Sequence, residues 1–194
     1  MNETEVASLF ERLDVLRRGH FRLSSGKHSD TYLQCALALS DPQVALSLGA
    51  ALADRIDSEV DVVVSPALGG VLAGFAVAAA LGRPFLFAER DSERHMTMRR
   101  GQQLQPGSRV LVVEDVVTTG GSAMEVVALC EAAGATVVGL ASLVDRSAGL
   151  DADQRSPLQP TSLLTVTAQA WDPPECPECA AGRPLDTPGS RHAA

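Results

Sequence analysis

The sequence is short of lysine, of long apolar runs and of the common nucleotide-binding signatures. Of its 16 lysine and arginine residues, only Lys27 is a lysine. No apolar run approaches the roughly 20 residues that a membrane-spanning helix needs, and the first residues hold no signal-peptide core. Neither a Gly-Lys-Ser/Thr phosphate loop nor a dinucleotide-binding glycine fingerprint occurs. These absences predict a cytoplasmic protein without a membrane partner, and one that does not use either of those loops.

The charge balance and the length narrow the class of protein further. A net charge of −8 argues against nucleic acid as a partner, because nucleic-acid binders carry a basic surface. The 194 residues are 45% hydrophobic, which is enough for one well-packed domain. We therefore expect a single domain over residues 1–194, with an N-terminal helix and hood segment (1–40), an α/β core (41–170) and a tail rich in proline and cysteine (171–194).

The four cysteines do not form an evident disulfide framework. Cys35 and Cys130 are isolated in apolar surroundings, and only Cys176 and Cys179 are close in sequence. Their C-x-x-C spacing supplies two of the four ligands that zinc requires, so a metal would need a second pair, for example from a partner subunit. A short structural turn is the favoured interpretation, and no metal is assigned to protein ligands.

The most informative stretch is VLVVEDVVTTGGS, residues 110–122. Its first four residues are typical of a buried parallel strand, and the apolar-periodic run 123–133, which stops at Gly134, is typical of a helix. The small polar residues in between therefore form a tight turn at a helix N-terminus, where unpaired N–H groups and hydroxyls attract an anion. The stretch predicts a phosphate-binding turn.

Glu114 and Asp115 directly precede this turn and would repel a bare phosphate. They suit sugar hydroxyls or a metal ion beside the phosphate, so a ligand with a phosphate, a diol and Mg²⁺ satisfies every part of the stretch. The alternative is an ordinary strand-to-helix turn, with glycines for packing and acids for solubility.

Hydrophobic periodicity predicts alternating helices and strands along the rest of the chain. Expected helices cover 4–18, 42–56 (capped by Asp41 or Ser40), 71–81 and 123–133. A hairpin or two short strands are expected over 19–34, strands over 61–65, 84–88, 110–113, 137–144 and 163–168, and a polar loop over 151–160. This pattern predicts an open, mostly parallel α/β sheet with flanking helices and a small N-terminal hood. Ligands bind at the carboxyl ends of such strands, where Ser65, Asp115 and Arg146 fall.

Two further segments could bind anions. The turn Pro66-Ala67-Leu68-Gly69-Gly70 again joins a strand to a helix N-terminus, although Gly70 could serve close packing instead. Five basic residues also gather between two strands of an otherwise acidic chain, in what we expect to be a mobile loop that steers an anionic substrate. They are Arg90, Arg94, His95, Arg99 and Arg100.

The sequence E-D-V-V-T-T-G-G-S resembles the phosphoribosyl-diphosphate (PRPP) binding loop of type I phosphoribosyltransferases. The resemblance implies that Glu114 and Asp115 hold the ribose hydroxyls and take part in catalysis, and that the following turn wraps the 5-phosphate. The PRPP-binding residues of this loop would be Glu114, Asp115, Val116, Val117, Thr118, Thr119, Gly120, Gly121 and Ser122. Mg²⁺ would be bound mainly through PRPP and pyrophosphate.

A second segment, GHFRLSSGKHS at 19–29, resembles one that is typical of orotate phosphoribosyltransferases. Family members often carry a basic residue after its last glycine, which Lys27 and His28 supply here, and Lys27 is thereby expected to contact PRPP. A solvated loop tip is the alternative for Lys27. The family resemblance also implies that Arg146 contacts the orotate carboxylate and that Thr118 contacts orotate, whereas a surface pair between Asp145 and Arg146 is the structural alternative.

The chain departs from the family pattern in two places. Many orotate enzymes carry lysine where this chain has Gly69, and their basic loop carries lysines where this chain has arginines. Arginine can bind pyrophosphate in a bidentate manner, so Arg90, Arg94, Arg99 and Arg100 are expected to bind PRPP. Arginine cannot exchange a proton near neutral pH, so His95 is the candidate proton donor, with a solvated position as its alternative.

The family implies a homodimer in which the basic loop reaches the neighbouring active site. Two rival functions remain open: a phosphoribosyltransferase for another base, and a non-catalytic protein that senses PRPP or nucleotides.

Overall fold

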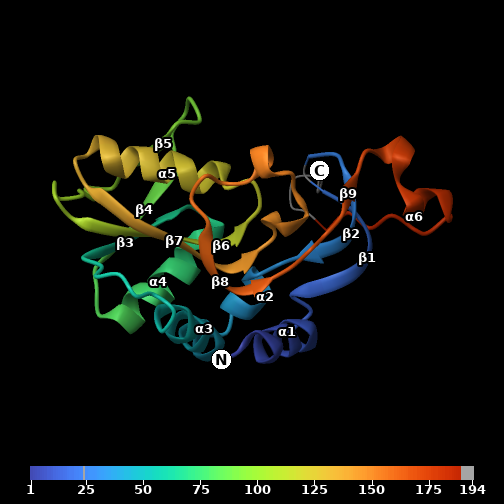
Figure 1. Cartoon of the computed structure of the whole chain (residues 1–194), viewed down its shortest axis with the longest axis horizontal. Helices are drawn as coiled ribbons and strands as arrows, with labels where there is room; N and C mark the ends of the chain where they lie inside the picture. The colour runs from blue at the N-terminus through green and yellow to red at the C-terminus, as the bar shows by residue number, and fades with distance from the viewer. Residues whose placement is uncertain (24, 189–194) are drawn as a thin grey trace.

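The fold is known from a computed structural model, which describes residues 1–23 and 25–188. Figure 1 shows a central sheet with helices on both faces, beside a smaller sheet that lies at the other end of the molecule. The two ends are built differently, because the central sheet joins consecutive strand–helix units whereas the smaller sheet joins the two ends of the chain.

The central sheet has six strands in the order β5-β4-β3-β6-β7-β8. Its strands are β3 (Val62–Pro66), β4 (Phe85–Arg90), β5 (Met96–Met98), β6 (Arg109–Val117), β7 (Thr136–Asp145) and β8 (Pro160–Thr165). All neighbouring pairs are parallel except the edge pair β4–β5. The predicted open, mostly parallel sheet is therefore confirmed, with β5 as an antiparallel addition in the basic loop.

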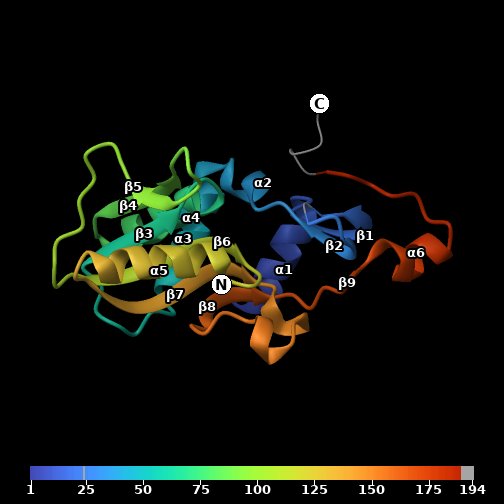
Figure 2. The same ribbon diagram turned by 90° about the horizontal axis from the view of Figure 1, so that it is seen from above.

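Helices cover both faces of this sheet, as the view in Figure 2 makes clear. They are α1 (Glu3–Arg12), α2 (Ala36–Leu39), α3 (Pro42–Ala53), α4 (Gly69–Leu81) and α5 (Gly121–Ala132). One hydrophobic cluster joins α1, α3 and α4 to the sheet, and a second joins α5 to its other face. The valine-rich strands are buried on both sides for this reason, which matches their continuous apolar runs.

Close helix packing depends on one glycine. A Cβ atom at Gly49 of α3 would lie 2.5 Å from the backbone carbon of Ala76 in α4. Because such a distance is a clash, only glycine allows these two helices to approach so closely. The N-terminus of α3 is capped by Asp41, whose side chain accepts a hydrogen bond from the Gln43 N–H at 2.8 Å, as one of the two predicted caps.

The smaller sheet combines the N-terminal hairpin with the C-terminal tail. Its strands, in the order β1-β2-β9, are β1 (Leu16–Arg22), β2 (His28–Leu33) and β9 (Ala170–Trp171). The hairpin was predicted and is confirmed, and β9 was not predicted. Beyond β9, the tail continues through η3 (Pro173–Glu175) and α6 (Pro177–Ala180) and then returns to β1, where Asp186 pairs with Phe21. Two further short helices follow β7: η1 (Ser147–Gly149) lies before the predicted polar loop 151–160, and η2 (Ala152–Gln154) lies within it.

The structure corrects several predicted boundaries. The predicted helix 4–18 is wrong beyond Arg12, because the chain turns at Asp14, which adopts a positive φ of 58°, and Leu16 begins β1. Strand β6 continues through both acidic residues to Val117, so the acids lie within the strand rather than after it. Among the described residues, no helix is long and apolar enough to cross a membrane. The division into one domain with three segments stays a prediction, and residues 189–194 of the tail segment lie outside the described range.

Candidate active site

A pocket of about 280 Å³ opens where β6 ends and α5 begins. Its lining contains most of the predicted PRPP loop together with two charged residues from neighbouring elements. The lining residues are Arg90, Glu114, Val116, Val117, Thr118, Thr119, Gly120, Gly121, Ser122, Ala123 and Glu125. The predicted phosphate-binding turn is thus a concave site at the carboxyl end of a parallel strand, where open α/β sheets bind ligands.

The turn itself is shaped by Gly120, which adopts φ = 75° and caps α5. A side chain at this position would be strained, and its Cβ would lie 2.6 Å from Cβ of the buried Ser156. The backbone therefore turns sharply and aims the first N–H groups of α5 at the pocket, while Thr118 and Thr119 stay exposed. The positive end of the helix dipole and these hydroxyls suit a phosphate group.

Glu114 and Asp115 are largely enclosed at the end of β6. Burial, together with the neighbouring Asp115 charge, raises the pKa of Glu114 to about 8. Burial also raises the pKa of Asp115 above its usual value. Two adjacent carboxyl groups that ionise with difficulty are held ready for a ligand that supplies hydroxyl donors or positive charge, because either would stabilise their charged forms.

The second glycine turn, at the start of α4, packs directly against these acids. A Cβ atom at Gly69 would lie 2.6 Å from Oδ1 of Asp115, and one at Gly70 would lie 2.9 Å from Oε2 of Glu114 and 3.0 Å from the Val113 carbonyl oxygen. The glycines therefore make room for the acid pair. The two predicted anion-binding turns converge on one place, although Asp115 faces Gly69 and does not line the 280 Å³ pocket.

Arg90, at the end of β4, closes one side of the pocket. Its guanidinium donates two hydrogen bonds of 2.8 Å to the carboxylate of Glu125 on α5 and a third to the Arg94 carbonyl oxygen. This bidentate pair raises the pKa of Arg90 and lowers the pKa of Glu125. Glu125 was missed from the sequence, because nothing in its spacing distinguishes it from a solvated residue of a helix.

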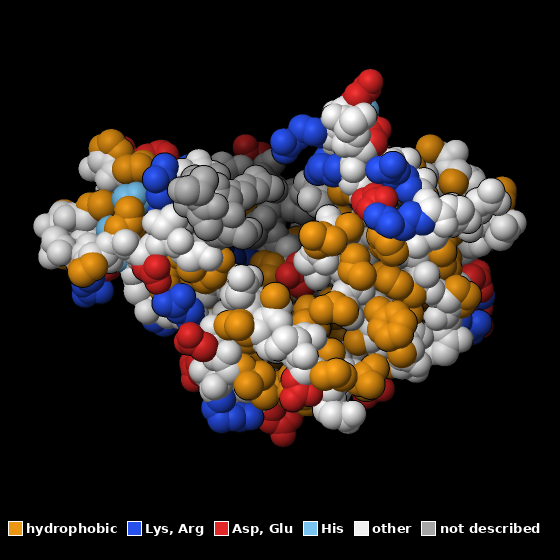
Figure 3. Space-filling view, turned by 180° about the vertical axis from the view of Figure 1, so that it is seen from behind, with side chains coloured by type: hydrophobic (Ala, Val, Ile, Leu, Met, Phe, Trp, Pro, Cys, Tyr) orange, Lys and Arg blue, Asp and Glu red, His pale blue; other side chains and the backbone are white. Residues whose placement is uncertain are grey.

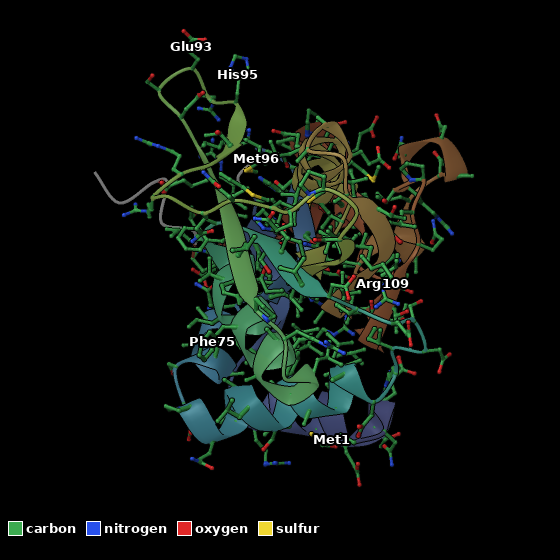
Figure 4. The ribbon with its side chains drawn as sticks, turned by 90° about the vertical axis from the view of Figure 1, so that its left-hand side faces the viewer. Met1, Phe75, Glu93, His95, Met96 and Arg109 are labelled. Atoms are coloured by element: carbon green, nitrogen blue, oxygen red, sulfur yellow. The ribbon has the colours of Figure 1, made fainter. Side chains whose placement is uncertain are left out.

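The rest of the basic loop lies away from this pocket. Figure 4 shows Glu93 and His95 at the tip of the loop, pointing outward. The side chain of His95 is 73% exposed, and Arg99 and Arg100 both lie near Glu89, at 3.9 and 3.0 Å. Within the described part of the chain, the pocket lining includes Arg90 from this loop but not Arg94, His95, Arg99 or Arg100. Their assignment to PRPP, and that of His95 to proton transfer, stay predictions.

Arg146 follows β7 and lies beside the same edge of the sheet. Its backbone N–H donates to the Val117 carbonyl oxygen (2.8 Å), and its guanidinium donates to the hydroxyl of Ser29 (3.2 Å). The proposed surface pair with Asp145 does not form, because Asp145 instead accepts a hydrogen bond from the Ser147 N–H. Burial lowers the pKa of Arg146. A half-buried guanidinium that donates to one neutral hydroxyl can still bind a planar carboxylate.

The hairpin residues have other neighbours than expected. Lys27 lies 3.7 Å from the carboxylate of Asp172 in the tail, so within this chain it faces the tail, and its assignment to PRPP stays a prediction. His28 is buried rather than a free basic residue at the loop tip. It lies with His20, Cys176 and Cys179 in one cluster, so the second pair of possible metal ligands comes from this chain and not from a partner.

Comparisons with known proteins agree with this geometry. The phosphoribosyl transferase domain model matches residues 38–175. The orotate phosphoribosyltransferase of Desulforamulus reducens is 45% identical over 192 residues, which cover 98% of each chain. That of Sphingopyxis alaskensis is 44% identical and covers all of both chains.

Solved structures give the same fold. The crystal structure of orotate phosphoribosyltransferase from Aeropyrum pernix has a TM-score of 0.69 at 27% identity, covering 83% of this chain and 93% of the other. That from Mycobacterium tuberculosis has a TM-score of 0.65 at 30% identity, covering 84% and 96%. With the two glycine turns, the acid pair and the arginine beside them all in place, this chain belongs to the phosphoribosyltransferase family, among the orotate phosphoribosyltransferases.

Proposed function

We propose that this chain transfers the phosphoribosyl group of PRPP to orotate, which yields orotidine 5′-monophosphate and pyrophosphate. The observation that carries the proposal is the convergence of the phosphate-binding turn, the acid pair and Arg146 at one edge of the sheet. The identity of 45% with a full-length orotate phosphoribosyltransferase supports the choice of base. The reaction serves pyrimidine synthesis, and we propose the cytoplasm as its location.

The chain's own residues act by positioning and by charge. The turn 118–122 holds the 5-phosphate, and the carboxylates of Glu114 and Asp115 accept hydrogen bonds from the ribose hydroxyls. As the bond to pyrophosphate breaks, positive charge grows on the ribose ring, and the two carboxylates stabilise it. Negative charge grows on the leaving pyrophosphate, for which Arg90 and the N-terminus of α4 offer donors at this edge of the sheet.

Mg²⁺ fits this site because two largely enclosed carboxyl groups offer hard oxygen ligands next to a phosphate-binding turn. When bound, mainly through PRPP and pyrophosphate, the ion would neutralise charge on the pyrophosphate. Glu114 and Asp115 are the residues of this chain that would face it.

Arg146 supports orotate over the other bases. A purine or uracil carries no carboxylate to pair with the half-buried guanidinium, whereas orotate does. Ser29, whose hydroxyl accepts from Arg146, itself donates to the Gln169 carbonyl oxygen at 2.7 Å. Thr118 lines the pocket, and we keep it as a contact for orotate.

The direct test is a PRPP-dependent assay across orotate, uracil, adenine and xanthine, in which pyrophosphate release is measured. We expect release with orotate and Mg²⁺, and none with the other bases. Pyrophosphate release with a different base would mean that this base, and not orotate, is the substrate. PRPP binding without pyrophosphate release in any mixture would favour the non-catalytic sensor function.

We also propose a homodimer in which each basic loop serves the neighbouring active site. The outward direction of the loop in Figure 4 supports this, because Arg94, Arg99 and Arg100 do not line the pocket of their own chain. A second support is an apolar surface that includes exposed side chains of α2, α3, α4 and the residue that precedes α4. Its residues and their exposed fractions are Leu37 (44%), Leu46 (43%), Leu68 (88%), Leu72 (50%) and Phe75 (56%). Figure 3 shows hydrophobic side chains gathered on the half of the molecule that holds α4, as expected of an interface.

Subunit mixing tests the shared site. One inactive protein carries Asp115→Asn, and another carries Arg94→Ala, Arg99→Ala and Arg100→Ala together. If the loops act across the interface, a mixed dimer has one site with both defects and one with neither, so activity returns to about half that of a wild-type dimer. If each loop acts in its own subunit, mixing restores nothing even after subunit exchange has been verified by mass.

A further inference from the structure

Four potential metal ligands meet where the C-terminal tail crosses the N-terminal hairpin. They are His20 of β1, His28 of β2, and Cys176 and Cys179 at the start of α6. One ligand atom from each lies within 4.8 Å of every other, although the two pairs are more than 140 residues apart in sequence. This set has no place in the mechanism above.

The distances match a tetrahedral ion. With Zn–N of about 2.0 Å and Zn–S of about 2.3 Å, tetrahedral ligation separates two nitrogens by about 3.3 Å, and a nitrogen and a sulfur by about 3.5 Å. Here Nε2 of His20 lies 3.0 Å from Nδ1 of His28, 3.5 Å from Sγ of Cys176 and 3.6 Å from Sγ of Cys179. Sγ of Cys179 lies 3.2 Å from Nδ1 of His28.

Hydrogen bonding alone does not account for this packing. The other ring nitrogen of His20, Nδ1, lies 3.0 Å from the Arg183 carbonyl oxygen, which can only accept, so Nδ1 carries a proton. In a neutral ring Nε2 then has one lone pair, and in a charged ring it has one proton. Either way it makes one good hydrogen bond, whereas three polar atoms crowd it. A single ion at the centre satisfies all three approaches.

The contact with Arg183 is also the arrangement that metal-binding histidines need. A ligating imidazole donates its second N–H to a carbonyl or carboxylate, which fixes the tautomer and the orientation of the ring. The Arg183 carbonyl plays this part for His20, and it belongs to the same tail segment as the two cysteines. Three of the four residues are buried, so the site is closed like a structural one rather than open like a catalytic one.

We propose that His20, His28, Cys176 and Cys179 bind one structural Zn²⁺ ion that fastens the tail to the hairpin. Two thiolates and two neutral imidazoles balance the charge of the ion and match its preferred ligand types. The proposal does not rest on the activity proposed above. It does affect the same region, because the neighbour of His28 in β2 is Ser29, which contacts Arg146.

The first test is elemental analysis of the protein, purified under reducing conditions without chelators and without an affinity resin that carries metal. We expect about one zinc ion per chain. Exchange for Co²⁺ should add the visible absorption bands of a tetrahedral site and a near-ultraviolet charge-transfer band from the thiolates. Per bound cobalt ion, replacement of one cysteine should weaken that band by about half, since one of two thiolates is lost.

The informative variants are Cys179→Ser, at the exposed member of the cluster, and Cys176→Ser. Each should lose most of its zinc and unfold at a lower temperature, because zinc binding contributes to folding. The matched control is Cys130→Ser, which alters a buried thiol in the core far from the cluster. This control is expected to lose stability but to keep its zinc, which separates ligation from a general loss of folding.

Three results would overturn the proposal. One is wild-type protein that contains no zinc and takes up no Co²⁺. Another is a control that loses as much zinc as Cys179→Ser does. The third is a disulfide between Cys176 and Cys179 in freshly isolated protein, found by mass spectrometry, since a disulfide removes both thiolates and would make the pair a redox element.

Discussion

The pocket at β6 and the cluster at the hairpin are two sites built from opposite kinds of sequence information. The pocket is local: nearly all of its lining comes from one unbroken stretch, and the strand, turn and helix that shape it follow each other directly. The cluster is distant: its four residues come from both ends of the chain and meet only because β9 pairs with β2. A local site can be recognised from its own sequence, whereas a distant one requires the fold.

This difference can be tested by damage at each site. Damage to the local site should remove chemistry and leave the fold intact, and damage to the distant site should loosen the fold. Four predictions at the active-site edge and at the hairpin follow, from the largest expected effect to the smallest.

Asp115→Asn should give the largest effect, a loss of roughly 10²–10³-fold in kcat, on the scale of one preorganised electrostatic group. The shape of the side chain is kept, so the melting temperature should not fall. Steady-state kinetics and thermal unfolding check the two halves of this expectation. Wild-type turnover would remove Asp115 from the site, and a large fall in melting temperature would make it a structural residue.

Arg146→Ala tests the place where the two regions meet, through the contact with Ser29. We expect the KM for orotate to rise roughly 30-fold, near the lower end of the cost of breaking a partly buried charge pair, about 2 kcal/mol. The KM for PRPP should change little. Ser29→Ala is the control, since it removes the neighbour without removing the charge, and it should have a much smaller effect. Equal weakening of both substrates would assign Arg146 a structural role.

Glu114→Gln should stabilise the ligand-free protein at alkaline pH. The pKa of Glu114 is raised to about 8 in the folded state, from an ordinary value near 4.5. Between these two values the unfolded state has lost a proton that the folded state keeps, so the free energy of unfolding falls as pH rises through this window.

Removal of the ionisable group should flatten this slope. At pH 8 the free energy of unfolding that is lost through the slope amounts to about 1–3 kcal/mol for a buried carboxyl group that is coupled to a neighbour. Asp115 has a raised pKa as well and keeps part of the slope. Urea unfolding of both proteins between pH 5 and pH 9 measures the difference. Parallel curves would mean that Glu114 is ionised in the free protein. The variant should also lose activity, so stability and function move in opposite directions here.

Lys27→Ala should give the smallest effect. Its pair with Asp172 is exposed, and exposed pairs contribute about 0.2–1 kcal/mol. If the pair with Asp172 is the whole role of Lys27, the variants Asp172→Ala and Lys27→Ala should have the same melting temperature and the same KM for PRPP. If Lys27 also contacts PRPP, as the family resemblance implies, only Lys27→Ala should raise the KM for PRPP.

The comparison also explains which features could be predicted from the sequence. The valine-rich strands, the glycine turns and the capping of α3 depend on neighbours within a few residues, so periodicity and turn chemistry were sufficient for them. The end of α1 was misjudged because the apolar spacing continues through Leu13 and Leu16, and only the turn at Asp14 separates helix from strand.

The cluster illustrates the opposite limit. The C-x-x-C pair was noticed, but its partners were not, because His20 and His28 lie in a stretch whose other residues suggested a substrate site. The usable indication was their position on paired strands: His28 pairs with Arg22, two residues from His20, so the two histidines share one face of the hairpin.

The contact between Ser29 and Gln169 has a consequence for the folding of this protein during its synthesis on the ribosome. The two residues are 140 positions apart, so at 5–20 residues per second the hairpin waits roughly 7–28 s for the strand that pairs with its outer edge. During that time β2 offers unpaired backbone groups to any other extended segment. Before the tail has been synthesised, the nascent chain would have a folded central sheet and pocket, but the smaller sheet would lack its third strand. The part of the site around Arg146 would therefore be the last to fold.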